Sequence, residues 1–293
     1  MTRIFKYTIT EREAGYSISD FLREKGYSRK LIIHLKKTNH GIVLNDKWDY
    51  VYSKLKAGDI LKIHLIESKS PAHILPVKMD LDIVYEDVDL MVINKPCNMP
   101  IHPSMGNYDN TLANGILEYF NQKGETFVYR CINRLDRDTT GLLIIAKNGL
   151  SAGILSEMGK RRKIDRTYLA VVKGTPPSYG RIDAPIGRVP DSVIEREVRF
   201  LDGEDAVTNY EVIKSKDGYS LVKLKLETGR THQIRVHMKH IGYPLIGDYL
   251  YYPDYDKIKR QALHSYRIKF LHPITGKEMD FCAELPEDMR ELV

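Results

Sequence analysis

A charged, turn-rich segment runs directly into an unbroken apolar run near the middle of this chain. The segment is Arg134–Gly141, and Leu142–Ala146 follows it without a linker. A short apolar run bounded by turn residues predicts a buried strand. Such a strand holds the residues before it rigidly, so Asp136, beside Arg134 and Arg137, can remain ionised and act as a nucleophile or a base.

Length and composition bound the class of protein. A chain of 293 residues with 42% hydrophobic content is long enough for two domains with a sizeable core. No apolar run approaches the roughly 20 residues that cross a bilayer, and the N-terminus lacks a signal-peptide core. We therefore expect a soluble cytoplasmic protein, a monomer with no membrane partner. Cys97, Cys131 and Cys282 lie far apart, which predicts reduced thiols rather than disulfides or a zinc knuckle.

The positive charge is concentrated at one end of the sequence. Residues 1–66 contain 13 Lys or Arg and 7 Asp or Glu, so they carry the whole net charge of +6. Six basic residues crowd onto two short helical patterns: Arg23, Lys25, Arg29, Lys30, Lys36 and Lys37. Such a face predicts contacts with nucleic-acid phosphates, and the alternative is an ordinary solvated helix face.

Residues 1–66 have the pattern of a small α/β module. One helix is expected from Ser17 to a left-handed cap at Gly26, and a second from Ser28. Short strands follow at 42–44 and 60–65. With Ser28–Lys30 opening the second helix and Leu55–Asp59 before the last strand, this order resembles the alpha-L RNA-binding module of ribosomal and RNA-modifying proteins.

Residues 67–77 mix polar residues with two prolines and predict a linker, so the second domain is expected at 78–293. This part of the chain is rich in strands with short connections and lacks the regular alternation of strand and helix of a parallel doubly wound sheet. The predicted fold class is therefore α+β, with a mixed, mainly antiparallel sheet and flanking helices. The expected strands are 81–85, 90–94, 142–147, 167–173, 195–201, 206–214, 220–227, 263–271 and 277–283, and the expected helices are 111–122, 149–160 and 231–241.

A second polar cluster, Leu226–Met238, lies where a strand is expected to end and a helix to begin. Thr228 or Thr231 is expected to cap that helix. Arg230 and Arg235 are candidates for pairing a carboxylate or a phosphate. His232, His237 and His240 lack the spacing of a zinc helix, and neither a Walker-type loop nor a dinucleotide glycine fingerprint occurs. We therefore predict no metal and no cofactor.

The two clusters together resemble the pseudouridine synthases that modify ribosomal and transfer RNA. The resemblance rests on Arg134–Gly141 and Thr228–Arg235. Further landmarks of that family occur in the same order: Tyr85–Asp87, Val92–Pro96, His102–Ser104, Arg166–Ala170 and Pro244–Asp248. The resemblance covers nearly the whole chain, including the basic N-terminal part.

The resemblance implies roles for individual residues. Asp136 is expected to be the catalytic aspartate, Arg230 to pair with it and keep it charged, and Tyr168 to stack on the target uracil. Arg134 is expected to fill the space left in the RNA by a flipped nucleotide, because the enzyme has to extrude the base to reach its glycosidic bond. The expected RNA contacts as a set are Arg134, Arg137, Arg235, Lys95, Arg23, Arg29, Lys30, Lys36 and Lys37.

Several points stay open at this stage. Asn133 stands where the family often has histidine, and Thr140 where it often has serine. Lys160–Lys163 fits either a solvated loop or a phosphate contact. Whether Asp136 attacks the sugar or the base, or removes a ribose proton, does not follow from residue types. Ribosomal RNA, of the large subunit, is the expected partner, with transfer RNA the alternative.

Two rival functions also fit part of the pattern. Asp136–Thr140 satisfies the Asp-x-Asp-x-Thr pattern of magnesium-dependent phosphatases, with Asp248 as a later metal ligand. In that family, however, an apolar strand precedes the first aspartate, whereas here it follows. The second rival is an RNA-binding assembly factor without essential catalysis.

Overall fold

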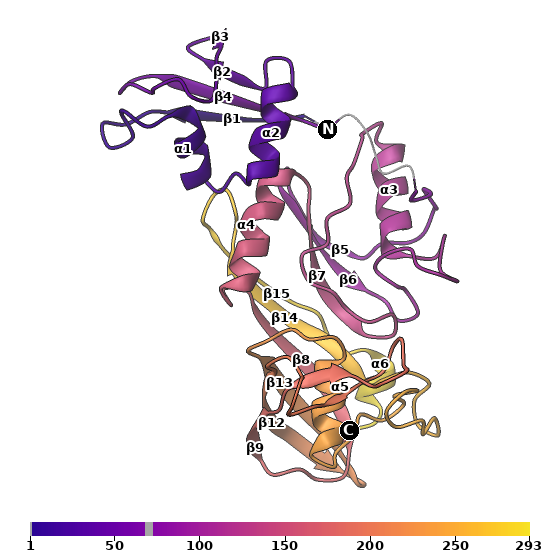
Figure 1. The fold of residues 1–293 in the computed structure, drawn as a ribbon. Helices are drawn as coiled ribbons and strands as arrows, with labels where there is room; N and C mark the ends of the chain where they lie inside the picture. The colour runs from indigo at the N-terminus through magenta and orange to yellow at the C-terminus, as the bar shows by residue number, and fades with distance from the viewer. Residues whose placement is uncertain (1, 68–72) are drawn as a thin grey trace.

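The computed structural model describes residues 2–67 and 73–293, which form two packed units (Figure 1). The first, here called the N-terminal module, covers residues 2–67. Its four-stranded antiparallel sheet has the order β1-β4-β2-β3. Its elements are β1 (Thr2–Thr8), α1 (Ile18–Glu24), α2 (Arg29–Lys37), β2 (Ile42–Leu44), β3 (Lys47–Trp48) and β4 (Ile60–Ile66).

Both helices of the module begin where the sequence predicts. The hydroxyl of Ser17 accepts the backbone N–H of Asp20, and that of Ser28 accepts the N–H of Leu31, so each serine satisfies a backbone donor of the first helical turn. Gly26 follows α1 with a φ of +91°, a backbone conformation that favours glycine. Of the predicted linker 67–77, residues 68–72 lie outside the described residues, and Ile74 packs in the core of the second unit.

The second unit, here called the main domain, covers residues 73–293. Its large sheet has the order β5-β6-β7-β14-β8-β13-β12-β9, with β15 paired to β14. The strands of this domain are β5 (Ile83–Glu86), β6 (Leu90–Lys95), β7 (Thr140–Ala146), β8 (Asp165–Lys173), β9 (Tyr179–Asp183), β10 (Ile186–Arg188), β11 (Arg196–Val198), β12 (Val207–Lys216), β13 (Tyr219–Leu226), β14 (Leu263–Leu271) and β15 (Glu278–Cys282). The helices are α3 (Leu112–Gln122), α4 (Gly149–Lys160), α5 (Gln233–His240) and α6 (Glu287–Arg290).

The predicted fold class is confirmed. Pairings in the large sheet are antiparallel except for β7 with β14, and helices flank the sheet (Figure 1). In the main domain, the predicted strands coincide with β5 to β8 and β11 to β15, and the predicted helices coincide with α3 to α5. No strand was predicted at β1, β3, β9 or β10. Both β1 and β9 alternate between exposed and less exposed residues, but the less exposed positions include Arg3 in β1 and Gly180 in β9, beside the buried Phe5 and Ile182. Apolar residues therefore do not alternate with polar ones along either sequence, which is the signal that predicts a half-buried strand.

Every residue of β7 is buried, as its apolar run predicts. Leu143 and Ile145 point into one hydrophobic core, which α3 covers, while Leu142 and Ile144 point into another on the opposite face. Successive side chains of a strand alternate between faces. Packing on both sides therefore fixes the position of β7 and of the loop that precedes it.

The N-terminal module is docked firmly on the main domain. The guanidinium of Arg3 donates to both carboxylate oxygens of Asp89 at 2.9 and 3.0 Å, and Asp89 is 2% exposed. Helix α4 runs from the module toward β8 and β13 (Figure 1). Its Leu150 belongs to the core of the module. The two units therefore share apolar packing and a bidentate ion pair, which fixes the module relative to the large sheet.

Within the ranges 2–67 and 73–293, no helix has both the length and the apolar character to pass through a membrane.

A substitution at Gly141 tests how tightly β7 packs on β14. Its φ is +106°, and a Cβ atom there would overlap the carbonyl oxygen of Ser265 and lie 2.7 Å from its nitrogen. We expect Gly141→Ala to lower the free energy of unfolding by about 3 kcal/mol or more, because it adds a backbone clash to the strain of positive φ. Gly106 has a φ of +78° and open space around it, so Gly106→Ala should cost about 1 kcal/mol. Denaturant unfolding measures both variants, and equal losses would contradict this view of the β7–β14 contact.

Candidate active site

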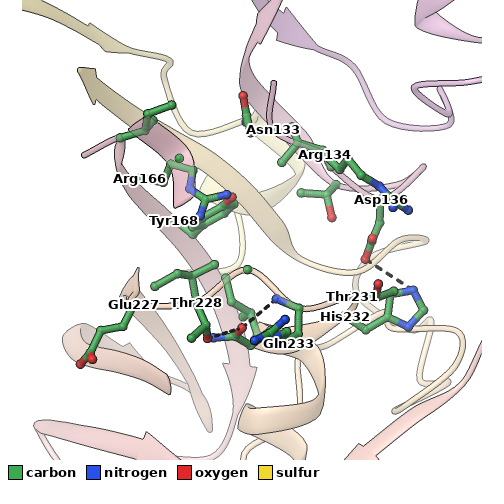
Figure 2. A pocket seen from close by; sticks show the side chains of 18 of the residues that line it. Asn133, Arg134, Asp136, Arg166, Tyr168, Glu227, Thr228, Thr231, His232 and Gln233 are labelled. Atoms are coloured by element: carbon green, nitrogen blue, oxygen red, sulfur yellow. Dashed lines mark hydrogen bonds and ion pairs between the residues drawn. The ribbon is translucent and has the colours of Figure 1, made fainter. Parts of the chain in front are cut away.

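A pocket of about 700 Å³ opens between four segments of the main domain (Figure 2). One wall is the loop 132–139, which leads into β7, and a second is the end of α4 with the residues that follow it, 156–164. A third is the start of β8 with Arg166 and Tyr168, and the fourth is the segment 226–235, which leads into α5. Its volume lies within the range of about 300–1,000 Å³ that small-molecule sites occupy. The pocket therefore brings together the two polar clusters that the sequence singled out.

The centre of the site is a buried arginine held between two carboxylates. Arg235, from α5, is 1% exposed. Its Nε and Nη2 atoms donate to the two carboxylate oxygens of Asp248, each at 2.7 Å. Its Nη1 donates to Oδ2 of Asp136 at 2.9 Å. A planar guanidinium can serve two carboxylates at once in fixed geometry, so Arg235 sets the position of Asp136 in the pocket.

Electrostatics keep this arginine charged. Burial by itself lowers the pKa of Arg235, but the hydrogen bonds to Asp248 and the negative charge of Asp136 outweigh it and raise the pKa above its usual value. Asp248 is fully buried and also accepts the backbone N–H groups of Leu250 and Tyr251. The side chain of Asp136, in contrast, is 30% exposed. One carboxylate therefore anchors the arginine, and the other remains accessible from the pocket.

The prediction that Arg230 pairs with Asp136 was wrong. Arg230 donates to Glu204 and to the backbone carbonyl of Asp205 instead, although it does line the pocket. Arg235, predicted to contact RNA, takes the place next to Asp136, and its burial excludes the predicted phosphate contact. Arg230 precedes α5 and points to the loop before β12, whereas Arg235 lies in the first turn of the helix and faces Asp136.

His232 approaches Asp136 from the other side. Its Nε2 atom lies 3.8 Å from Oδ2 of Asp136 (Figure 2), and burial lowers its pKa, which favours the neutral ring. Its Nδ1 atom lies 2.8 Å from the hydroxyl of Tyr251. Burial raises the pKa of Tyr251 to about 12, so the hydroxyl keeps its proton. When Tyr251 donates to Nδ1, the imidazole proton is on Nε2 and faces Asp136.

The backbone of His232 is in the left-handed region, with a φ of +58°, and no side chain caps α5. The prediction that Thr228 or Thr231 caps this helix was wrong. Thr228 donates instead to Oε1 of Gln233, which also accepts the backbone N–H of Arg230. A left-handed non-glycine residue costs roughly 1–2 kcal/mol, and such strain is often found at functional sites. No local pattern predicts the approach of His232 to Asp136, because the two residues are 96 positions apart.

Tyr168 and Arg134 also line the pocket. Tyr168, on β8, is 4% exposed and belongs to the hydrophobic core that α3 covers. Arg134 is exposed and lies next to Asp136 in the loop (Figure 2). Asp136, Tyr168 and Arg134 therefore surround one space, as the resemblance implies.

Lys95 is the second correction among the predicted RNA contacts. It is 1% exposed, and its Nζ atom donates to the backbone carbonyls of Pro96 and Arg137 at 2.7 and 2.8 Å. Burial lowers its pKa to about 7, against the opposing effect of Asp138 and Asp136. Lys95 therefore lies beneath the loop of Asp136 and holds its backbone, out of reach of an RNA phosphate.

The other predicted RNA contacts are on the surface: Arg23, Arg29, Lys30, Lys36, Lys37, Arg134 and Arg137. Arg137 forms an ion pair with Asp138, and Arg23 approaches Asp20 at 3.7 Å. Of the basic run at 160–163, Lys160 and Arg162 line the pocket. These side chains are open to solvent, and their contacts with RNA stay a prediction.

Asn133 and Thr140, the two residues that differ from the usual pattern of the family, both form hydrogen bonds that stabilise the structure. The amide oxygen of Asn133 accepts the backbone N–H of Ile144 at 2.9 Å, so Asn133 ties the loop to β7. The hydroxyl of Thr140 lies 2.8 Å from Nδ1 of the buried His264. Both positions therefore need hydrogen-bonding groups, which asparagine and threonine supply.

Comparison with known proteins agrees with this geometry. Residues 89–240 match the family model described as RNA pseudouridylate synthase. An uncharacterized RNA pseudouridine synthase of Bacillus subtilis, YjbO, is 40% identical over 94% of this chain and 98% of its own length. Ribosomal large subunit pseudouridine synthase D of Zymomonas mobilis is 40% identical over 97% of this chain and 95% of its own. Among solved structures, human RNA pseudouridylate synthase domain containing 1 superposes with a TM-score of 0.59 at 28% identity, covering 70% of this chain and 83% of that one.

The two arginines near the pocket differ in their expected contribution to stability. Removing Arg235 leaves the buried carboxylate of Asp248 without its partner, so Arg235→Ala should lower the free energy of unfolding by about 3–5 kcal/mol. Arg230 forms a partly exposed ion pair, so Arg230→Ala should cost less than about 1 kcal/mol. Denaturant unfolding at neutral pH compares the two variants. A larger loss for Arg230→Ala would contradict the assignment.

Lys95 should make stability depend on pH. Its pKa falls from an ordinary 10.5 to about 7 in the folded protein, so between these values the unfolded chain binds more protons. Stability then rises with pH through this window, by at most about 1.4 kcal/mol per unit. We expect wild type to gain stability relative to Lys95→Met as the pH rises from 7.5 to 9.5, as measured by denaturant unfolding. A constant difference between the two proteins would show that Lys95 is not buried in this way.

Proposed function

Because the chain belongs to the RNA pseudouridine synthase family, we propose that it isomerises specific uridines of large-subunit ribosomal RNA, with Asp136 as the catalytic carboxylate. The observation that carries the proposal is the contact of Asp136 with the buried Arg235 at the edge of the pocket. The guanidinium fixes the position of the carboxylate through a charge-assisted hydrogen bond. The side chain of Asp136 stays 30% exposed, on the side from which a uridine would enter.

The reaction is an isomerisation within one nucleotide. The bond between the ribose C1′ and N1 of uracil breaks, the uracil rotates, and C1′ bonds to C5. The proton leaves C5 and N1 gains one, so the product has the composition of the substrate. Asp136 serves as a nucleophile or as a base in this sequence. We propose that side chains supply all of this chemistry and that no cofactor takes part.

Access to the glycosidic bond requires the uridine to leave the RNA stack, at a cost of a few kcal/mol. We assign part of the compensation to Tyr168, whose ring lines the pocket and can stack on the uracil. Arg134 is exposed beside the pocket and can fill the space that the base leaves. Arg166, whose guanidinium lies near Gly229 at the mouth of the pocket, is placed to contact an RNA phosphate.

The choice of ribosomal RNA rests on relatives and on charge. Several relatives of similar length are named ribosomal large subunit pseudouridine synthase D, among them that of Escherichia coli K12, with 36% identity. Arg29, Lys30, Lys36 and Lys37 on α2 are exposed, and among the described residues they form no ion pairs, as expected for a surface that neutralises phosphates. We propose that the enzyme acts in the cytoplasm, where ribosomal RNA is found.

The contacts of Asp248 and Asp138 weigh against the two rival functions, a magnesium-dependent phosphatase and an RNA-binding assembly factor. In the phosphatase interpretation Asp248 would bind magnesium, but both of its oxygens are occupied by Arg235. Asp138 pairs with Arg137 rather than converging with Asp136 on one site. An assembly factor without catalysis would not need a carboxylate anchored in a pocket by a buried arginine.

The decisive experiment is the reaction itself with Asp136→Asn. We expect the purified wild type to convert uridine to pseudouridine in transcripts of large-subunit ribosomal RNA without added metal or nucleotide. Asp136→Asn should lower the rate by about four orders of magnitude, because the amide can act neither as an anionic nucleophile nor as a base. RNA affinity should change by less than about threefold, since Arg235 still has Asp248.

Asp138→Asn is the matched control, because this neighbouring carboxylate pairs with the partly exposed Arg137. It should retain conversion within about tenfold of wild type. Pseudouridine is measured by mass spectrometry of nuclease digests. Conversion by Asp136→Asn at the wild-type rate would overturn the proposal.

A further inference from the structure

Three aromatic side chains lie exposed side by side at one edge of the N-terminal module. Trp48 is 43% exposed, Tyr50 is 52% exposed and Tyr52 is 69% exposed. Trp48 ends β3, which lies at the outer end of the module, on the side away from the main domain (Figure 1). Single exposed aromatics are common on protein surfaces, but a contiguous apolar patch marks a binding surface.

The rings form a ladder. The ring of Trp48 meets that of Tyr50 edge to face, with 4.4 Å between centroids. The rings of Tyr50 and Tyr52 are stacked, with centroids 5.1 Å apart and planes 11° apart. Because Tyr52 is the most exposed of the three, its ring offers a flat apolar surface at the end of this stack.

The segment that carries the ladder is held rigidly. The carboxylate of Asp49 accepts the backbone N–H of Tyr50 and the hydroxyl of Ser53. The carbonyls of Val51 and Ser53 accept the N–H groups of Ser19 and Ile18 at the start of α1. The rings therefore need little ordering on binding, which lowers the entropic cost of a contact.

The charge around the ladder is positive. Lys47, Lys54 and Lys56 flank it in the sequence and are exposed. Within the described part of the chain, none of these ammonium groups forms an ion pair, whereas the carboxylate of Asp49 is occupied by hydrogen bonds. A surface that combines aromatic faces with unpaired cations has the chemistry that binds single-stranded nucleic acid.

We propose that Trp48, Tyr50 and Tyr52 form a stacking platform for an unpaired nucleotide of the RNA substrate. The proposal rests on the proposed function in taking RNA as the partner, and it adds a second contact point remote from the pocket. A duplex does not fit this surface, because its bases are already stacked and present only their edges. The platform would therefore select RNAs that expose an unpaired base at a distance from the target uridine.

Trp48 provides a direct probe, since it is the single tryptophan of the chain. The full-length Asp136→Asn protein is titrated with single-stranded oligoadenylate and with a long, blunt-ended RNA duplex that has no unpaired base, so that binding is measured without reaction. We expect oligoadenylate to quench the Trp48 fluorescence and the duplex to leave it nearly unchanged. Absence of quenching by oligoadenylate, or equal quenching by both, would overturn the proposal.

Variants separate stacking from charge. Tyr52→Ala should weaken oligoadenylate binding by about fivefold or more, because one base–aromatic contact contributes about 1–3 kcal/mol. Tyr52→Phe should bind within about twofold of the parent, since it keeps the ring. The matched control is Tyr179→Ala on β9, which removes a tyrosine that is 78% exposed on the main domain and should change nothing. Equal affinities of Tyr52→Ala and Tyr179→Ala would contradict the platform.

Two further measurements identify the occupant. The slope of log affinity against log salt should be the same for Tyr52→Ala and its parent, because no phosphate contact is lost, whereas Lys36→Gln with Lys37→Gln should reduce it.

Light scattering tests whether the patch joins two copies of the chain. A change in oligomeric state in Tyr52→Ala with unchanged oligoadenylate affinity would replace the RNA platform with a protein interface. Loss of uridine conversion in wild type with normal quenching would overturn the proposed function alone.

Discussion

The ion-paired triad of Asp248, Arg235 and Asp136 is the interaction on which the site depends. Asp248 is completely buried, and its carboxylate also accepts two backbone N–H groups that hold it in place. A buried charge is tolerated when it is paired and hydrogen-bonded, and Arg235 meets that condition by binding two carboxylates. The result is a carboxylate at the pocket, that of Asp136, whose position is set by the buried Arg235.

The loop that carries Asp136 is supported from several directions at once. Asn133 ties its beginning to β7, and Lys95 binds the carbonyl of Arg137 from below. Beyond the loop, β7 is packed on both faces by separate hydrophobic cores. Such support holds a reactive group within a narrow range of geometry, while the side chain of Asp136 itself stays partly open to the pocket.

The N-terminal module belongs to the same rigid assembly. Arg3 pairs with the buried Asp89, and Leu150 of α4 joins the core of the module. The other end of α4 reaches the pocket, where Lys160 contributes to its wall. One helix thus connects the basic module to the pocket and fixes the position of one relative to the other.

Local chemistry in the sequence was sufficient to identify the helix starts at Ser17 and Ser28, the buried strand after Gly141, the basic face of α2 and the family motifs around Asp136. These features depend on neighbours in the chain, which the sequence displays directly. The choice of Arg235 over Arg230, the approach of His232 and the burial of Lys95 were decided by tertiary structure. Asp136 and Arg235 are 99 positions apart, and the helix that carries Arg235 follows a left-handed residue that turns one arginine inward and leaves the other outside. No local pattern specifies which side chains two distant segments bring face to face, because that depends on how the sheet and its helices pack in three dimensions.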